Sequence, residues 1–135
     1  MTSQFDWSFN DGWILMSVYL AHGPGGVSLP DLIATADAMN HAIPTSGELS
    51  RALTRLARCR VINQIDDRFF IAAEFLPGLA EANSRQGGLF QLPENGRNWL
   101  SSVDFELDEH AEIKVRQENV TAAFEHYRNA LKRPK

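Results

Sequence analysis

The clearest hydrophobic pattern in the chain lies between residues 46 and 58. Its apolar residues recur at the i, i+3, i+4, i+7, i+8 spacing that buries one stripe of a helix, and they are Leu49, Ala52, Leu53, Leu56 and Ala57. Thr45, followed three residues later by Glu48, fits a capping box at the start of that helix. The sequence therefore predicts a capped amphipathic helix whose outer face carries Arg51, Thr54, Arg55 and Arg58.

Two helices are expected before this one. The nearly all-apolar stretch from Gly12 to about His22 predicts a first helix that lies centrally in the core, with Asp11 as its N-cap. A second helix is expected from Ser28 to about Asn40, because serine is a good N-cap and the proline two residues later is tolerated in a first turn. The short turn that ends at proline 44 makes the second and third helices a helix-turn-helix unit.

The pattern changes after the third helix to branched and aromatic residues around an acidic reversal. Val61, Ile62 and Ile65 precede Asp66-Asp67, and Phe69-Phe70-Ile71 follow it. Such runs on either side of a short polar turn predict a β-hairpin.

The remaining segments give weaker patterns. Alternating Phe5, Trp7 and Phe9 favour a short strand or an extended arm on the core. Helices that serve as surface cover are expected at about 77–85 and 92–102. A strand pair within 104–115 remains an alternative to helix in that segment. A long helix is expected over about 109–132, with the apolar stripe Val120, Ala123, Phe124, Tyr127 and Leu131.

Composition adds the size and the charge. The 135 residues fit a first domain over 1–75, with an N-terminal arm, and a helical extension over 76–135. The net charge of −4 is unfavourable for nucleic-acid binding, yet residues 28–72 are neutral and place their arginines on one helix face. The single Cys59 cannot form an intrachain disulfide, and the N-terminus is acidic rather than basic. We therefore expect a cytoplasmic protein.

Catalytic motifs are missing from the sequence. The four histidines are scattered, and the sequence contains no HExxH motif and no paired cysteine motif. The glycine-rich stretch at 23–26 lacks the Lys-Ser/Thr pair that would follow in a phosphate-binding loop. Cys59 is expected to be a small buried hydrophobe. We expect no enzyme, no cofactor and no metal site.

The order of helix, helix, capped helix and hairpin resembles the winged helix-turn-helix superfamily of bacterial DNA-binding proteins. The residues that carry the resemblance are Trp13-Ile14-Leu15, Leu32-Ile33, Thr45 with Glu48-Leu49, Ala52-Leu53-Leu56, Val61-Ile62 and Phe69-Phe70-Ile71. They cover about half of the chain. The resemblance implies a mainly α-helical fold with a small β-hairpin, that is, a winged helix-turn-helix plus a C-terminal helical extension.

The resemblance also implies a transcriptional regulator that binds double-stranded DNA. The third helix would lie in a major groove with the hairpin as a wing beside it. The implied DNA-binding residues are Ser46, Gly47, Ser50, Arg51, Thr54, Arg55, Arg58 and Arg68. The wing departs from the family pattern, since Asp66 and Asp67 occupy the tip, where a wing that contacts DNA usually offers lysine or arginine.

Two alternatives remain open on the sequence. The acidic pI and wing tip would also suit a winged helix that makes protein–protein contacts and does not bind DNA. The acidic stretch of Asp104, Glu106, Asp108, Glu109 and Glu112 is either a solvated face or a segment that folds over Arg51 and Arg55 and competes with DNA.

The C-terminal stripe is expected to pair two chains into a homodimer.

Overall fold

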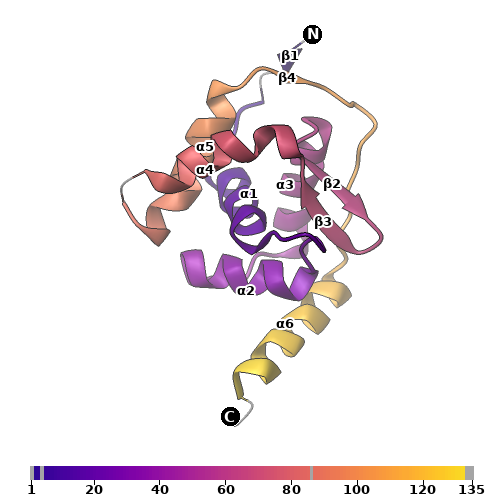
Figure 1. The fold of residues 1–135 in the computed structure, drawn as a ribbon. Coiled ribbons are helices and arrows are strands. Elements are labelled where there is room, and N and C mark those ends of the chain that lie inside the picture. Colours follow the sequence, from indigo (N-terminus) through magenta and orange to yellow (C-terminus); the bar gives the residue numbers. More distant parts are fainter. Residues whose placement is uncertain (1, 4, 86, 133–135) are drawn as a thin grey trace.

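The computed structural model describes residues 2–3, 5–85 and 87–132, and it is mainly helical (Figure 1). Three helices come first: α1 (Phe9–Ala21), α2 (Leu29–Asn40) and α3 (Ser46–Arg58). The strands β2 (Ile62–Ile65) and β3 (Arg68–Ile71) then form an antiparallel hairpin. This order of elements confirms the one predicted from the hydrophobic pattern.

The second half of the chain adds three helices and a short strand. The 3-10 turn η1 (Ala73–Phe75) leads into helix α4 (Leu76–Ser84), and the 3-10 turn η2 (Leu89–Gln91) leads into helix α5 (Leu92–Ser102). Both helices lie close to their predicted ranges. The strand β4 (Phe105–Glu106) pairs antiparallel with β1 (Thr2–Ser3). The strand pair considered within 104–115 does not form, because β4 is the only strand in that fully described segment. The last helix is α6 (Gln117–Lys132), which extends away from the body in Figure 1.

The N-terminal caps explain where the first three helices begin. The capping box of α3 is confirmed, because the Glu48 amide donates to the Thr45 hydroxyl at 3.0 Å and the Thr45 amide donates to the Glu48 carboxylate at 2.9 Å. Ser28 caps α2 as predicted. The predicted cap of α1 was wrong: Ser8 is the N-cap, and Asp11 is its box partner three residues later. The helix therefore starts at Phe9 rather than at residue 12.

The hairpin turns tightly at its acidic tip. Asp66 has a positive φ of 57°, which suits a two-residue turn between paired strands, and Ile65 lies opposite Arg68. Val27 forms an isolated antiparallel bridge with Phe69 on the outer edge of β3. The connection between α1 and α2 thus adds a third strand position to the hairpin.

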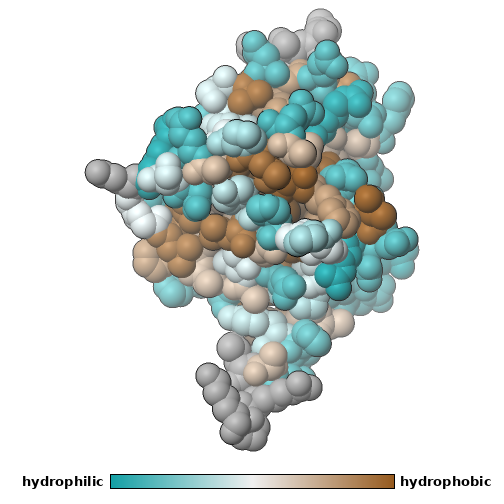
Figure 2. Space-filling model, in the orientation of Figure 1, coloured by the Kyte–Doolittle hydropathy of each residue, from teal (hydrophilic) through white to brown (hydrophobic). Residues whose placement is uncertain are grey.

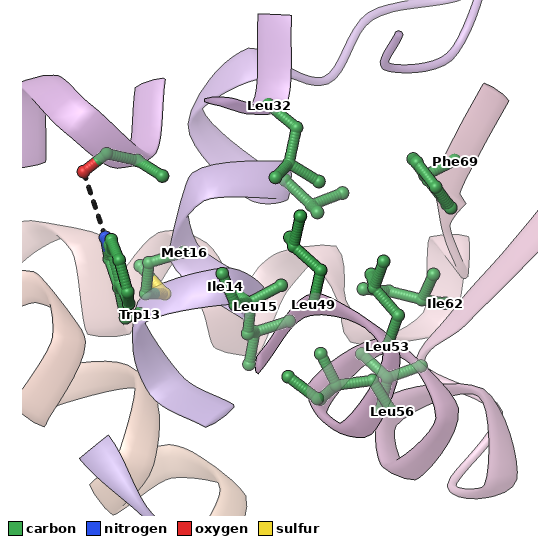
Figure 3. Packing of buried hydrophobic residues seen from close by; sticks show 14 of the residues in the cluster. Trp13, Ile14, Leu15, Met16, Leu32, Leu49, Leu53, Leu56, Ile62 and Phe69 are labelled. Carbon is green, nitrogen blue, oxygen red and sulfur yellow. Dashed lines mark hydrogen bonds between the residues drawn. The ribbon is translucent and has the colours of Figure 1, made fainter. Parts of the chain in front are cut away.

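One hydrophobic core joins both halves of the chain. Figure 3 shows Ile14 and Leu15 of α1 packed toward Leu49 and Leu53 of α3. The Trp13 indole is 2% exposed and donates to the Ala36 carbonyl of α2 at 3.0 Å. α1 is therefore central to the core, as its composition predicted.

Helix α5 belongs to this core, so the expectation that it is surface cover was wrong. It packs on α1 at a glycine-to-glycine crossing, where a Cβ on Gly12 would lie 2.0 Å from the Pro93 carbonyl oxygen. A Cβ on Gly96 would lie 2.7 Å from the Met16 side chain. The helix backbones can approach this closely only because both positions lack a side chain.

The predicted helix over 109–132 was wrong in its first eight residues. Residues 108–116, called the strap below, contain no helix and precede α6, which begins at Gln117. α6 then packs on α2 through Val120, Ala123 and Tyr127, whose hydroxyl donates to Asp37 at 3.0 Å. These three residues belong to the stripe that was predicted to pair two chains, but they face α2 of the same chain.

Among the described residues, no helix combines the length and the apolar character needed to cross a bilayer.

Candidate functional site

The outer face of α3 holds the strap. The Thr54 hydroxyl donates to the Ile113 carbonyl and accepts from the Ile113 amide, both at 2.9 Å. The Ser50 hydroxyl does the same with Val115, at 3.1 and 2.8 Å. The Arg58 Nε donates to the Ala111 carbonyl at 3.0 Å. Three side chains of one helical stripe thus bond every second residue of the strap.

The match follows from two backbone repeats. Residues i and i+4 of a helix are about 6 Å apart along its axis, and residues i and i+2 of an extended chain are about 6.6 Å apart. Ser50, Thr54 and Arg58 are spaced by four residues and meet positions 115, 113 and 111, which are spaced by two. The strap therefore runs antiparallel to α3, with one contact at each step.

The same alternation buries the strap's apolar side chains. Ile113 is 4% exposed and Val115 is 8% exposed, whereas Glu112 and Lys114 face solvent. An extended strap places both branched side chains in the core and gives the amides and carbonyls of Ile113 and Val115 hydroxyl partners on α3. A helix would have directed Ile113 and Val115 to different faces. This burial explains why tertiary packing replaced the expected helix.

Arg55 is held by the N-terminal arm, the segment that carries Phe5 and Trp7 before α1, instead of facing outward. Its side chain is 12% exposed and lies 3.5 Å from the Asp11 carboxylate, which is itself 1% exposed. One terminal nitrogen donates to the Asp6 carbonyl at 2.8 Å. The guanidinium carbon also lies 4.9 Å from the centre of the Phe5 ring and 5.3 Å from that of Trp7. Arg55 therefore fixes the aromatic arm to the core, through a buried ion pair and cation–π contacts.

Three predicted site residues remain on an open surface of α3. Arg51 and Gly47 are exposed and Ser46 is half-buried. A shallow depression of about 740 Å³ lies beside them, between the strap and the arm. Arg68 is exposed on β3 of the hairpin. The structure therefore leaves Arg51 as the one arginine of α3 whose side chain is exposed.

The acidic stretch approaches α3 through its backbone rather than its carboxylates. The Asp108 amide donates to the Arg58 carbonyl at 2.7 Å, at the C-terminal end of α3. Among the residues that the structure describes, no carboxylate from 104–112 lies within ion-pair distance of Arg51 or Arg55. The stretch therefore contacts α3 through the Asp108 amide and the Ala111 carbonyl, and both of these bonds go to Arg58.

Cys59 is buried at the end of α3, as predicted. Its side chain is 1% exposed, and burial raises the pKa of the thiol to about 12, although the nearby Arg55 charge lowers it in part. A thiol with so high a pKa is not a nucleophile at neutral pH. The cysteine therefore adds no reactive group to this face.

Sequence reasoning missed the strap as a partner of α3. The signal was the period of two in Ala111, Ile113 and Val115, together with hydroxyl side chains four residues apart on the outer face of a helix. Either feature alone is common, and only the fold brings them together. No known family model, curated protein or solved structure matches this chain.

Proposed function

We propose that this chain is a winged-helix protein that works through protein–protein contacts and does not read DNA with α3. The order of α1, α2, α3 and hairpin supports the winged-helix assignment. The contact between α3 and the strap carries the functional part of the proposal.

The strap occupies the stripe of Ser50, Thr54 and Arg58 on the face that would enter a major groove. Its removal would break five side-chain hydrogen bonds to α3 and expose Ile113 and Val115. A DNA duplex would have to displace these contacts before α3 could enter its groove.

Two features of the predicted DNA face favour a protein partner over DNA. Arg51 is the exposed arginine of α3, and the Arg55 charge is compensated by Asp11. The hairpin tip places Asp66 and Asp67 where a DNA-contacting wing needs positive charge. Because phosphate neutralisation provides most of the affinity of a DNA-binding protein, these side chains offer little of it.

Several large apolar side chains are exposed on different elements of the chain. Phe90 is 64% exposed, Ile65 is 55% exposed and Leu20 is 39% exposed. Figure 2 shows hydrophobic residues, in brown, extending across the centre of one face toward both sides of the molecule. Apolar surface rimmed by polar residues is typical of protein-binding sites.

DNA binding is tested with fluorescein-labelled random duplex DNA at low salt. We expect no saturable change in anisotropy with the wild type. The variant Arg51→Ala, with Arg85→Ala at the C-cap of α4 as the control, should give the same result. Binding that weakens steeply with salt and is lost in Arg51→Ala alone would overturn the proposal, because it would show phosphate contacts made by α3.

Protein contact is tested by photo-crosslinking in the cells that produce the chain. A photoreactive residue replaces Phe90 or Ile65, and Glu74, an exposed polar residue, is replaced as the control. We expect a discrete crosslinked band that includes another protein from at least one apolar position and none from the control. Equal, diffuse crosslinking from all three positions would contradict a specific protein-binding surface.

A further inference from the structure

A cavity of about 440 Å³ opens where the hairpin, the first turn of α2, the strap and the start of α6 meet. These elements come together at the lower right of the body in Figure 1. Buried apolar residues from three of them line the cavity: Phe69 of β3, Val115 of the strap and Ala123 of α6. The volume lies within the range of ordinary small-molecule sites.

Basic side chains from three separate elements line the same cavity. They are Arg68 on β3, Lys114 on the strap and His126 on α6, and Asp67 supplies the one carboxylate of the lining. In the part of the chain that the structure describes, neither Arg68 nor Lys114 has a carboxylate within ion-pair distance. The cavity thus has an excess of positive charge that the protein itself does not neutralise.

Polar neutral groups complete the lining. The amides of Gln64 and Asn119 border the cavity, and so does the start of α2 at Ser28 and Leu29. The N-terminal end of α2 adds positive electrostatic potential to the cavity. The Asp31 amide in its first turn is not free to bind a ligand, because it already donates to the Ser28 hydroxyl. Apolar residues beside a few positive groups suit a ligand with an apolar body and one negative end.

We propose that this cavity binds a small organic acid. Its carboxylate lies by Arg68 and Lys114, and its apolar body lies on Phe69, Val115 and Ala123. Such a ligand contacts the hairpin, the strap and α6 together. This site is distinct from the apolar surface of the proposed function and does not depend on it.

The test is a two-dimensional amide NMR titration with phenylacetate. The matched probes are 2-phenylethanol, which is neutral, and phenylethylamine, which is cationic. We expect saturable shifts centred on Lys114, Val115 and Arg68 with phenylacetate, and a dissociation constant on the order of 1 mM for a ligand of this size. The neutral and cationic probes should bind at least about tenfold more weakly, because they lack the charge that the site recognises.

Variants locate the site. Arg68→Gln combined with Lys114→Gln should weaken phenylacetate binding about tenfold, since two exposed charge contacts are lost. Arg116→Gln is the control, because Arg116 is exposed, pairs with Glu118 and does not line the cavity. The spectrum of each variant reports whether it is folded. Equal binding of all three probes, no saturable shift with phenylacetate, or unchanged affinity in the folded double variant would each overturn the proposal.

Discussion

At the scale of single residues, position in the fold decides what an arginine or a cysteine does. Arg55 and Arg51 both belong to the arginine face predicted from the helical pattern. Arg55 is buried against Asp11 and the aromatic arm, whereas Arg51 is exposed. Helical spacing predicts which residues share a face, but it does not reveal which of them a distant segment will cover.

Cys59 gives a test at this scale. The pKa of the Cys59 thiol is about 12 in the folded protein and near 9 in the unfolded chain. The stability that the protonated thiol contributes is therefore complete below pH 9 and is lost as pH rises from 9 toward 12. At pH 8 the native thiol should react with iodoacetamide at least about a hundredfold more slowly than the thiol in urea-unfolded protein, because it reacts only on opening. The measurement is the labelling rate followed by mass spectrometry. Equal rates would contradict a buried thiol.

At the scale of elements, the capped helix and the hairpin could be predicted because their signals are local. A capping box spans four residues, and a hairpin turn lies between the strands that it joins. The strap could not be assigned in this way. Its conformation depends on Ser50 and Thr54, which are about sixty residues away in sequence. Local propensity therefore predicted a helix where long-range contacts favour an extended chain.

The crossing of α1 and α5 gives a test at the scale of elements. Gly12→Ala places a methyl group against the backbone of α5, so the helices must separate, at a cost of about 1–3 kcal/mol or more. Gly47→Ala is the matched control, because its Cβ would lie 4.0 Å from the nearest atom and helix propensity favours alanine by up to about 1 kcal/mol. Urea denaturation should show a loss of stability for Gly12→Ala and no loss for Gly47→Ala. Equal stability of the two variants would show that the crossing is not tightly packed.

At the scale of the whole molecule, the predicted extension is part of the same core as the predicted first domain. α5 packs on α1, the strap lies on α3, and α6 lies on α2. The part of the α3 outer face that carries Ser50, Thr54 and Arg58, which the family resemblance assigned to DNA, is an internal packing surface for the C-terminal part of the chain. Gly47 and Arg51 on the same helix stay exposed. The mainly helical fold with a hairpin could be predicted from the sequence, and the covering of this face could not.

Amide hydrogen exchange of the strap, followed residue by residue by NMR, tests whether the strap lies extended on α3. The Ile113 and Val115 amides donate to hydroxyls of α3, whereas the described residues provide no hydrogen-bond acceptor for the amides of Glu112 and Lys114. We predict slow exchange at 113 and 115 and fast exchange at 112 and 114. Thr54→Val, which removes a hydroxyl but keeps the shape of the side chain, should speed exchange at Ile113.

The pattern of exchange distinguishes the strap from its alternatives. Continuous protection from 112 to 115 would indicate the helix that the local sequence predicts. Uniformly fast exchange would indicate that α3 is open and free to contact DNA. Either result would contradict the account, and alternating protection that weakens at Ile113 in Thr54→Val would support it.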